Sequence, residues 1–250
     1  MSVHVLFRLP ENTTMPFDTL PAELRLHVYQ YLPELQTGRQ ETVAPLVALT
    51  PGICRASKWL REETLPLYAG NASFHIQADQ DAYPKGDRVN IWLGALGDAI
   101  KHVRNFNLSR HWTINGPTRW QGHVGFYFRM ERVSDQWRAS AGTYPVAHDL
   151  RGMRAESVEL LQHVIREVVI QPIHSRDKPQ LQHSDVQFIA AAMDVIATRP
   201  ISAFDTEQSE AGRQRRRKAW MEMERGLYAL SPKSEAPGAL VTKGTFFTPY

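Results

Sequence analysis

Apolar residues recur at helical spacing in residues 17–32, and this pattern predicts a short amphipathic helix near the N-terminus. Pro21 suits the first turn of a helix, where its missing N–H costs nothing, and Glu23 lies near the positive end of the helix dipole. The residues on its apolar face are Leu20, Leu24, Val28, Tyr31 and Leu32. We expect this face to pack either against the chain's own core or against a partner protein.

The pattern changes to alternation in the middle of the chain, which predicts a sheet. The clearest strand is 124–130, in which every second residue is apolar, and a turn at 134–135 joins it to a strand at 136–140. Residues 109–120 are polar and read as a loop. The predicted strands are 72–76, 104–108, 124–130 and 136–140.

Helical spacing returns in the last hundred residues. The first helix there is expected to end before Pro172, and the second opens with a capping-box pattern at Ser184. The predicted helices are 155–170, 184–198 and 205–230, in addition to one at 87–103. The elements together predict an α+β fold, in which an N-terminal helical segment packs on a small, mostly antiparallel sheet of about four strands, with three C-terminal helices.

Composition shifts divide the chain into four parts. We expect a leader at 1–16, a helical segment at 17–78, an α+β body at 79–230 that is continuous with this segment, and a tail at 231–250. No internal repeat is present, which argues against a solenoid or propeller.

Composition and charge narrow the class of protein. Of the 250 residues, 42% are hydrophobic and 22% are charged, which is typical of a globular chain. The net charge of +3 is too small for a dedicated nucleic-acid binder, so we expect no nucleic-acid partner. The single cysteine, Cys54, excludes an internal disulfide and fits a reducing compartment. Because we find no membrane span or signal peptide, we expect a cytoplasmic or nuclear protein without a membrane partner.

Four short motifs in the first third of the chain occur in a fixed order. They are Leu-Pro-Ala-Glu-Leu-Arg at 20–25, Ile-Cys-Arg at 53–55, Glu-Thr-Leu-Pro-Leu-Tyr at 63–68 and Asn-Ala-Ser-Phe at 71–74. In this order they resemble the F-box-like family of fungal proteins. The link at 33–48 is longer than the link in a compact F-box.

This resemblance implies a protein-interaction module, in which the N-terminal helix docks on the adaptor of a cullin-type ubiquitin ligase and the C-terminal region holds a target. The contact residues that it implies are Leu20, Pro21, Leu24 and Val28. The target itself is not identified by the sequence.

A second hypothesis is an enzyme or small-ligand-binding protein, in which the F-box-like helices belong to one continuous core. A pocket between the sheet and the C-terminal helices would then bind the ligand. The aromatic and histidine residues expected to line it are His111, Trp112, Trp120, His123 and His148.

Three further residue groups have the chemistry of a catalytic or metal site, but each is incomplete. Cys54 lies between an apolar residue and an arginine, as a small core residue does. His163 and Glu167 are four residues apart on a predicted helix, but no third ligand accompanies them. His148 and Asp149 lie in a loop-like stretch without a nucleophile motif. We therefore assign no catalytic residue, metal or cofactor, and favour a binding protein over an enzyme.

A dense basic run lies on the last predicted helix. Its cations are Arg213, Arg215, Arg216, Arg217 and Lys218. Such a run is typical of a nuclear-targeting signal or of a solvated helix face whose charges pair with acids a turn away. Because Glu210 and Glu222 flank it on the same helix, we favour the solvated face.

Overall fold

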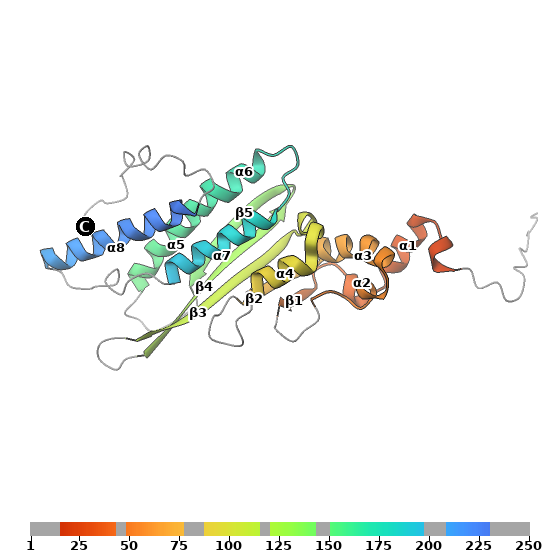
Figure 1. Cartoon of the computed structure of the whole chain (residues 1–250), viewed down its shortest axis with the longest axis horizontal. Helices are drawn as coiled ribbons and strands as arrows, with labels where there is room; N and C mark the ends of the chain where they lie inside the picture. The colour runs from red at the N-terminus through yellow and green to blue at the C-terminus, as the bar shows by residue number, and fades with distance from the viewer. Residues whose placement is uncertain are drawn as a thin grey trace, which may run out of the picture.

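The computed structural model describes residues 16–43, 49–77, 88–115, 121–143, 151–197 and 209–230. The fold is α+β, as the sequence predicts, with helices packed on one face of a five-stranded sheet (Figure 1). Inward-facing residues of the strands, such as Phe106, Phe128 and Met130, are completely buried. Their neighbours on the opposite face, such as Asn107 and Arg129, are partly or fully exposed, which is the alternation expected of a sheet covered on one side.

The sheet is mixed and has five strands, where the sequence predicts about four; most of its paired residues lie in antiparallel strand pairs, as predicted. Its strands lie in sequence order, with the first two neighbouring pairs parallel and the last two antiparallel. The strands are β1 (Gln40–Val43), β2 (Ser73–Gln77), β3 (Asn105–Asn115), β4 (Gln121–Val133) and β5 (Gln136–Thr143). Helices connect β1 to β2 and β2 to β3, and parallel neighbours require such crossover connections.

Two parts of the sheet have no alternating pattern of their own, and the sequence analysis missed both. β1 lies in the polar link at 33–48, and only Val43 among its four residues is buried. The last part of β3 lies in the predicted loop at 109–120, where pairing with β4 extends the strand to Asn115. The predicted turn at Ser134 and Asp135 is confirmed, since both residues have positive φ and join β4 to β5 as a two-residue hairpin.

The N-terminal segment contains several short helices. The helix predicted at 17–32 is in fact two helices, because the backbone is extended at Leu20, the residue before Pro21. A further short helix begins at Pro33. The helices of this segment are η1 (Phe17–Thr19), α1 (Ala22–Tyr29), η2 (Pro33–Leu35), α2 (Ile53–Ala56) and α3 (Lys58–Asn71). Ser57 caps α3, since its Oγ accepts a hydrogen bond from the Leu60 N–H at 3.1 Å.

The helices of the body cover the sheet. They are α4 (Arg88–Leu96), η3 (Gly97–His102), α5 (Arg151–Ile165), η5 (Arg166–Ile170), α6 (Gln171–His174), α7 (His183–Ala197) and α8 (Glu210–Ala229). The Trp92 ring of α4 packs between Phe74 and Phe106, with ring centroids 5.2 and 6.1 Å away. Buried residues of the N-terminal helices, such as Tyr29, and of α8, such as Leu227, belong to the same core.

Two details of the C-terminal helices differ from the sequence-based expectation. Helix continues past Pro172, and the turn before it, η5, is a π-helix. Pro172 has no N–H for the carbonyl one turn earlier, and the wider turn accommodates this loss. α7 begins at His183, and Asp185 rather than Ser184 closes its first turn by accepting from the Gln182 N–H at 2.8 Å.

Candidate docking surface

Helix α1 exposes large apolar side chains to solvent. Tyr31, just after the helix, is 71% exposed, and Leu24, Leu26 and Val28 are 52%, 44% and 42% exposed. These are four of the eight large hydrophobic residues that are exposed within the described part of the chain. Leu24, Val28 and Tyr31 follow one another at spacings of four and three and share one side of this segment, whereas Leu26 lies on another side. The side with Leu24, Val28 and Tyr31 is the strongest candidate for a contact with another molecule.

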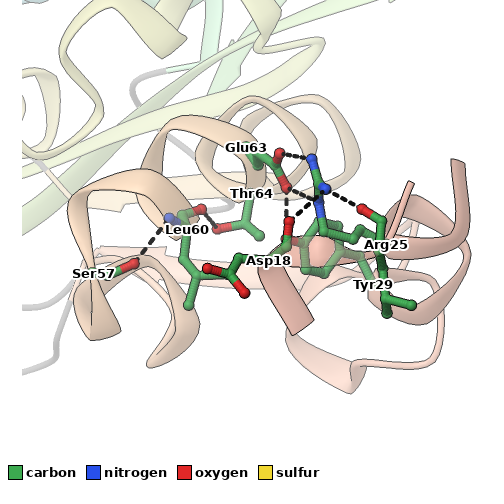
Figure 2. A network of polar contacts seen from close by, with 8 residues as sticks. Asp18, Arg25, Tyr29, Ser57, Leu60, Glu63 and Thr64 are labelled. Atoms are coloured by element: carbon green, nitrogen blue, oxygen red, sulfur yellow. Dashed lines mark hydrogen bonds and ion pairs between the residues drawn. The ribbon is translucent and has the colours of Figure 1, made fainter. Parts of the chain in front are cut away.

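The helix contacts the rest of the protein along a narrow stripe on its other side. Tyr29 is buried, and Arg25, four residues earlier, points to the same neighbour, helix α3. Figure 2 shows this contact, in which Arg25 and Tyr29 converge on the carboxylate of Glu63. Arg25 Nε and Nη2 lie 3.1 and 2.5 Å from the two carboxylate oxygens, and the Tyr29 hydroxyl donates to Oε2 at 2.8 Å. A fork of this kind fixes both distance and orientation.

Aromatic rings enclose the same contact. The Arg25 guanidinium lies 5.0 Å from the ring centroid of Trp59, which is a cation–π distance. Phe17 packs against Tyr29 and Trp59 with centroids 5.7 and 6.3 Å away. Arg25 also donates to the backbone carbonyl of Leu20, which ties the entry of α1 to the same group. The short helix is therefore held in one orientation by side chains instead of by its own length.

The groups in this contact shift one another's pKa values and so determine which of them are charged. Hydrogen bonding to Arg25 lowers the pKa of Glu63, although desolvation opposes the shift. Burial, together with the bond to Glu63, raises the pKa of Tyr29 to about 12. At neutral pH, Glu63 is thus ionised and Tyr29 keeps the proton that it donates.

The structure separates the residues that the sequence analysis assigned to the docking face. Leu24 and Val28 lie at the surface, so the hypothesis that they plug the core is wrong for both. Pro21 is exposed, and Leu20 is half-buried. Leu32 packs against the core, because it follows Arg25 and Tyr29 on the inward stripe. The sequence analysis did not assign Leu26 to the exposed surface or Arg25 to the inward stripe. The i, i+4, i+7 spacing of Arg25, Tyr29 and Leu32 is the signal that could have revealed the inward stripe.

The aromatic and histidine pocket of the second hypothesis falls largely outside the described residues. Trp120 and His148 lie outside them, and the side chains of His111, Trp112 and His123 are not described. The register of β3 and β4 places Thr113 opposite His123, so the backbones of these residues lie on one hairpin.

The structure instead contains a groove at the edge of the sheet, which we call the β5 groove. It has a volume of about 490 Å³ and is open to solvent. Its walls are β5 and the continuous helix formed by α5, η5 and α6, which run along that strand (Figure 1). Its lining residues are Trp137, Arg138, Ala139, Gln162, Arg166, Ile170, Gln171 and His174, none of which the sequence analysis proposed.

The catalytic and metal candidates have structural explanations. Cys54 is buried, its Sγ lies 3.2 Å from Thr64 Oγ1, and burial raises the pKa of its thiol, which disfavours the reactive thiolate. His163 Nε2 lies 3.4 Å from Glu167, which also accepts from the Tyr228 hydroxyl at 3.1 Å. No group of three or more metal-ligating side chains occurs among the described residues, and His148 and Asp149 lie outside them.

The basic run lies on α8. Arg213 pairs with Glu210 at 2.8 Å, and this contact lowers the pKa of the glutamate. Arg215, Arg217 and Lys218 are exposed, and the side chain of Arg216 is not described. The Arg213 contact is the local pairing expected of a solvated face. Within the described ranges, we find no helix whose length and apolar character would suffice to cross a bilayer.

Comparisons with known proteins complete this picture. Models of known protein families, curated proteins and solved structures were compared with the chain, and none of them matches it. The candidate site is therefore defined by the chain's own residues, with α1 and its exposed apolar side chains at its centre.

Proposed function

We propose that this protein is an F-box-like interaction module, in which α1 docks on the adaptor of a cullin-type ubiquitin ligase and the α+β body holds a target. One observation carries the proposal. Leu24 and Val28 on α1, and Tyr31 just after it, present apolar surface to solvent, and the Arg25 and Glu63 contact holds this helix in position.

The balance of forces around α1 supports a role in binding. Exposed leucine and tyrosine side chains contribute no hydrophobic stabilisation to the free protein. Each contributes such stabilisation to a complex when a partner covers it. Aromatic and aliphatic residues grouped on a rigid element are also the anchors around which interfaces form. A helix that is already held in position before binding loses little conformational freedom when it binds, which favours affinity.

The test is direct binding of the purified protein to a purified ligase adaptor. Leu24→Asp/Val28→Asp places two charges in the proposed interface, and we expect it to abolish binding. Both positions are exposed, so the thermal melt by circular dichroism should change little.

A matched control separates the docking face from exposed apolar surface in general. Ile91 and Val133 are 52% and 39% exposed and lie on α4 and β4, away from α1 in the sequence. The variant Ile91→Asp/Val133→Asp should therefore bind as the unmodified protein does. Equal loss of binding in both variants, or no binding by the unmodified protein, would refute the proposal.

A further inference from the structure

Within the part of the chain that the structure describes, the β5 groove at the outer edge of the sheet is lined by cations and by no acid. Arg138 and Arg166 both line it, and its polar neighbours there are amides and an imidazole. Glu131, directly opposite Arg138 in the β4–β5 register, pairs instead with Arg129 at 2.9 Å. Among the described residues, no carboxylate forms an ion pair with Arg138 or Arg166. The register places the Arg138 side chain on the outer face of the sheet with Glu131, so Arg138 borders the groove at its rim, whereas Arg166 lies on its helical wall. Neither arginine has an internal counter-ion among the described residues.

His174 adds a hydrogen-bond donor to this groove. The backbone N–H of Trp137 donates to His174 Nε2 at 2.9 Å. An Nε2 atom that accepts this bond leaves Nδ1 as the donor nitrogen of the ring. His174 is exposed, so this second nitrogen is accessible to a ligand in the groove.

The edge of β5 limits the size of the ligand. Outward-facing backbone groups occur at every second residue of an antiparallel edge strand, here at positions 137, 139 and 141. His174 occupies the N–H of Trp137, and the Gln162 amide donates to the Ala141 carbonyl at 3.1 Å. Among the described residues of β5, only Ala139, between them, lines the groove with its backbone edge open. This is too short for an added strand, so the groove fits a small molecule better than an extended peptide.

The helical wall of the groove has an unusual geometry. Arg166 and Ile170 are the first and last residues of the π-helix η5, and both line the groove. Such wide turns are rare and occur often at functional sites. Here the wide turn separates two lining residues of different character, one cationic and one apolar.

From these observations we infer that the β5 groove binds a small organic molecule that carries a phosphate or carboxylate group on a compact apolar part. Arg166 and the Nδ1–H of His174 provide donors for the anionic group, and Arg138 adds positive charge at the rim of the groove. Ala139 and Ile170 provide surface for the apolar part. A volume of about 490 Å³ lies within the usual range for such ligands.

The test uses three probes that differ only in their charged group: phenyl phosphate, benzoate and benzylamine. Each is titrated into the full-length protein by calorimetry, and the Trp137 indole N–H resonance is followed by NMR. We expect saturable binding of at least one anion with a shift of that resonance, and no binding of benzylamine. Binding of phenyl phosphate alone identifies phosphate as the recognised group, and binding of benzoate alone identifies carboxylate.

Variants then locate the site. Arg138→Gln/Arg166→Gln should weaken anion binding at least tenfold. Arg55→Gln/Arg217→Gln removes the same charge from exposed positions on α2 and α8 and should leave binding unchanged. Should the first variant melt at a lower temperature, Arg138→Lys/Arg166→Lys retains the charge and should lose affinity less than the glutamine pair.

The inference is overturned if neither anion binds saturably, if benzylamine binds equally well, or if the control variant loses as much affinity as the groove variant. These outcomes do not involve α1. The groove can therefore fail its test while the docking proposal stands, and the reverse also holds.

Discussion

Arg25 and Glu63 are 38 residues apart in the sequence and form a two-point contact that joins α1 to α3. The contact explains how a helix of eight residues keeps a defined position while its opposite side is exposed. Isolated helices of this length are unstable in water, so α1 depends on its neighbours. The docking surface and the ion pair behind it are thus two sides of one structure.

Loss of the Glu63 carboxylate should loosen α1. We expect Glu63→Ala to lower the free energy of unfolding by about 1–2 kcal/mol, because charged hydrogen bonds are lost at a contact that is partly exposed to solvent. The measurement is urea unfolding. Glu62→Ala is the control, since Glu62 is exposed and its one ion pair among the described residues is with Lys58, at 3.9 Å; it should change stability by less than about 0.5 kcal/mol. Equal effects of the two changes would contradict a role for this contact.

The same contact should depend on pH. Arg25 lowers the pKa of Glu63 in the folded state below its ordinary value of about 4.3. The stabilisation is therefore complete above that ordinary value and is lost as the pH falls through the lower, folded-state pKa. The free energies of unfolding of the unmodified protein and of Glu63→Gln should differ at pH 7 and converge as the pH falls below the ordinary glutamate pKa of about 4.3. A difference that grows with acidity would contradict this assignment.

Replacement of two glycines by alanine should change the stability of the fold in opposite directions. Gly142 lies opposite Tyr127 in the β4–β5 register, and an added Cβ would lie 2.5 Å from the Tyr127 hydroxyl oxygen. We expect Gly142→Ala to destabilise the fold by about 1–3 kcal/mol, because the ring must move. Gly94, in α4, has open space, so Gly94→Ala should stabilise by up to about 1 kcal/mol through helix propensity. Thermal melts of the two variants check both signs.

Replacing cations of α8 tests whether the basic run is a solvated helix face or a nuclear-targeting signal. Arg215→Gln/Arg216→Gln/Arg217→Gln keeps long, helix-compatible side chains, so we expect the stability to change by less than about 1 kcal/mol. We also expect the cellular distribution of a fluorescent fusion to stay the same. A fusion that leaves the nucleus only when these arginines are changed would show that the run is a nuclear-targeting signal.

Much of the fold could be predicted from the sequence because its elements have clear local patterns. The β4–β5 hairpin has alternating residues and a two-residue turn, and both are visible without a structure. β1 could not be predicted, because only Val43 of its residues is buried and its pairing depends on β2, which lies 30 residues later. The π-helix before Pro172 is likewise a local response to a proline that usually ends a helix.

The candidate site was predictable only in part. The apolar spacing of α1 identified Leu24 and Val28, but it also placed Leu32 on the same face. Spacing alone cannot tell which side of a helix faces the core when a polar residue such as Arg25 contributes to the inward stripe. The β5 groove was not predictable, because it combines residues from β5 with residues of a helix more than twenty positions later.

The short strand β1 has a consequence for any shortened form of this protein. β1 pairs with β2, and the Ser73 N–H also donates to the Arg39 carbonyl at 2.8 Å, so the N-terminal segment covers one edge of the sheet. A chain that began after residue 48 would lose α1 and would also leave β2 with unpaired backbone groups at an apolar strand. Such an edge is a template for association between molecules. Removal of the docking helix by truncation would therefore create a self-associating protein, and its behaviour would reveal little about docking.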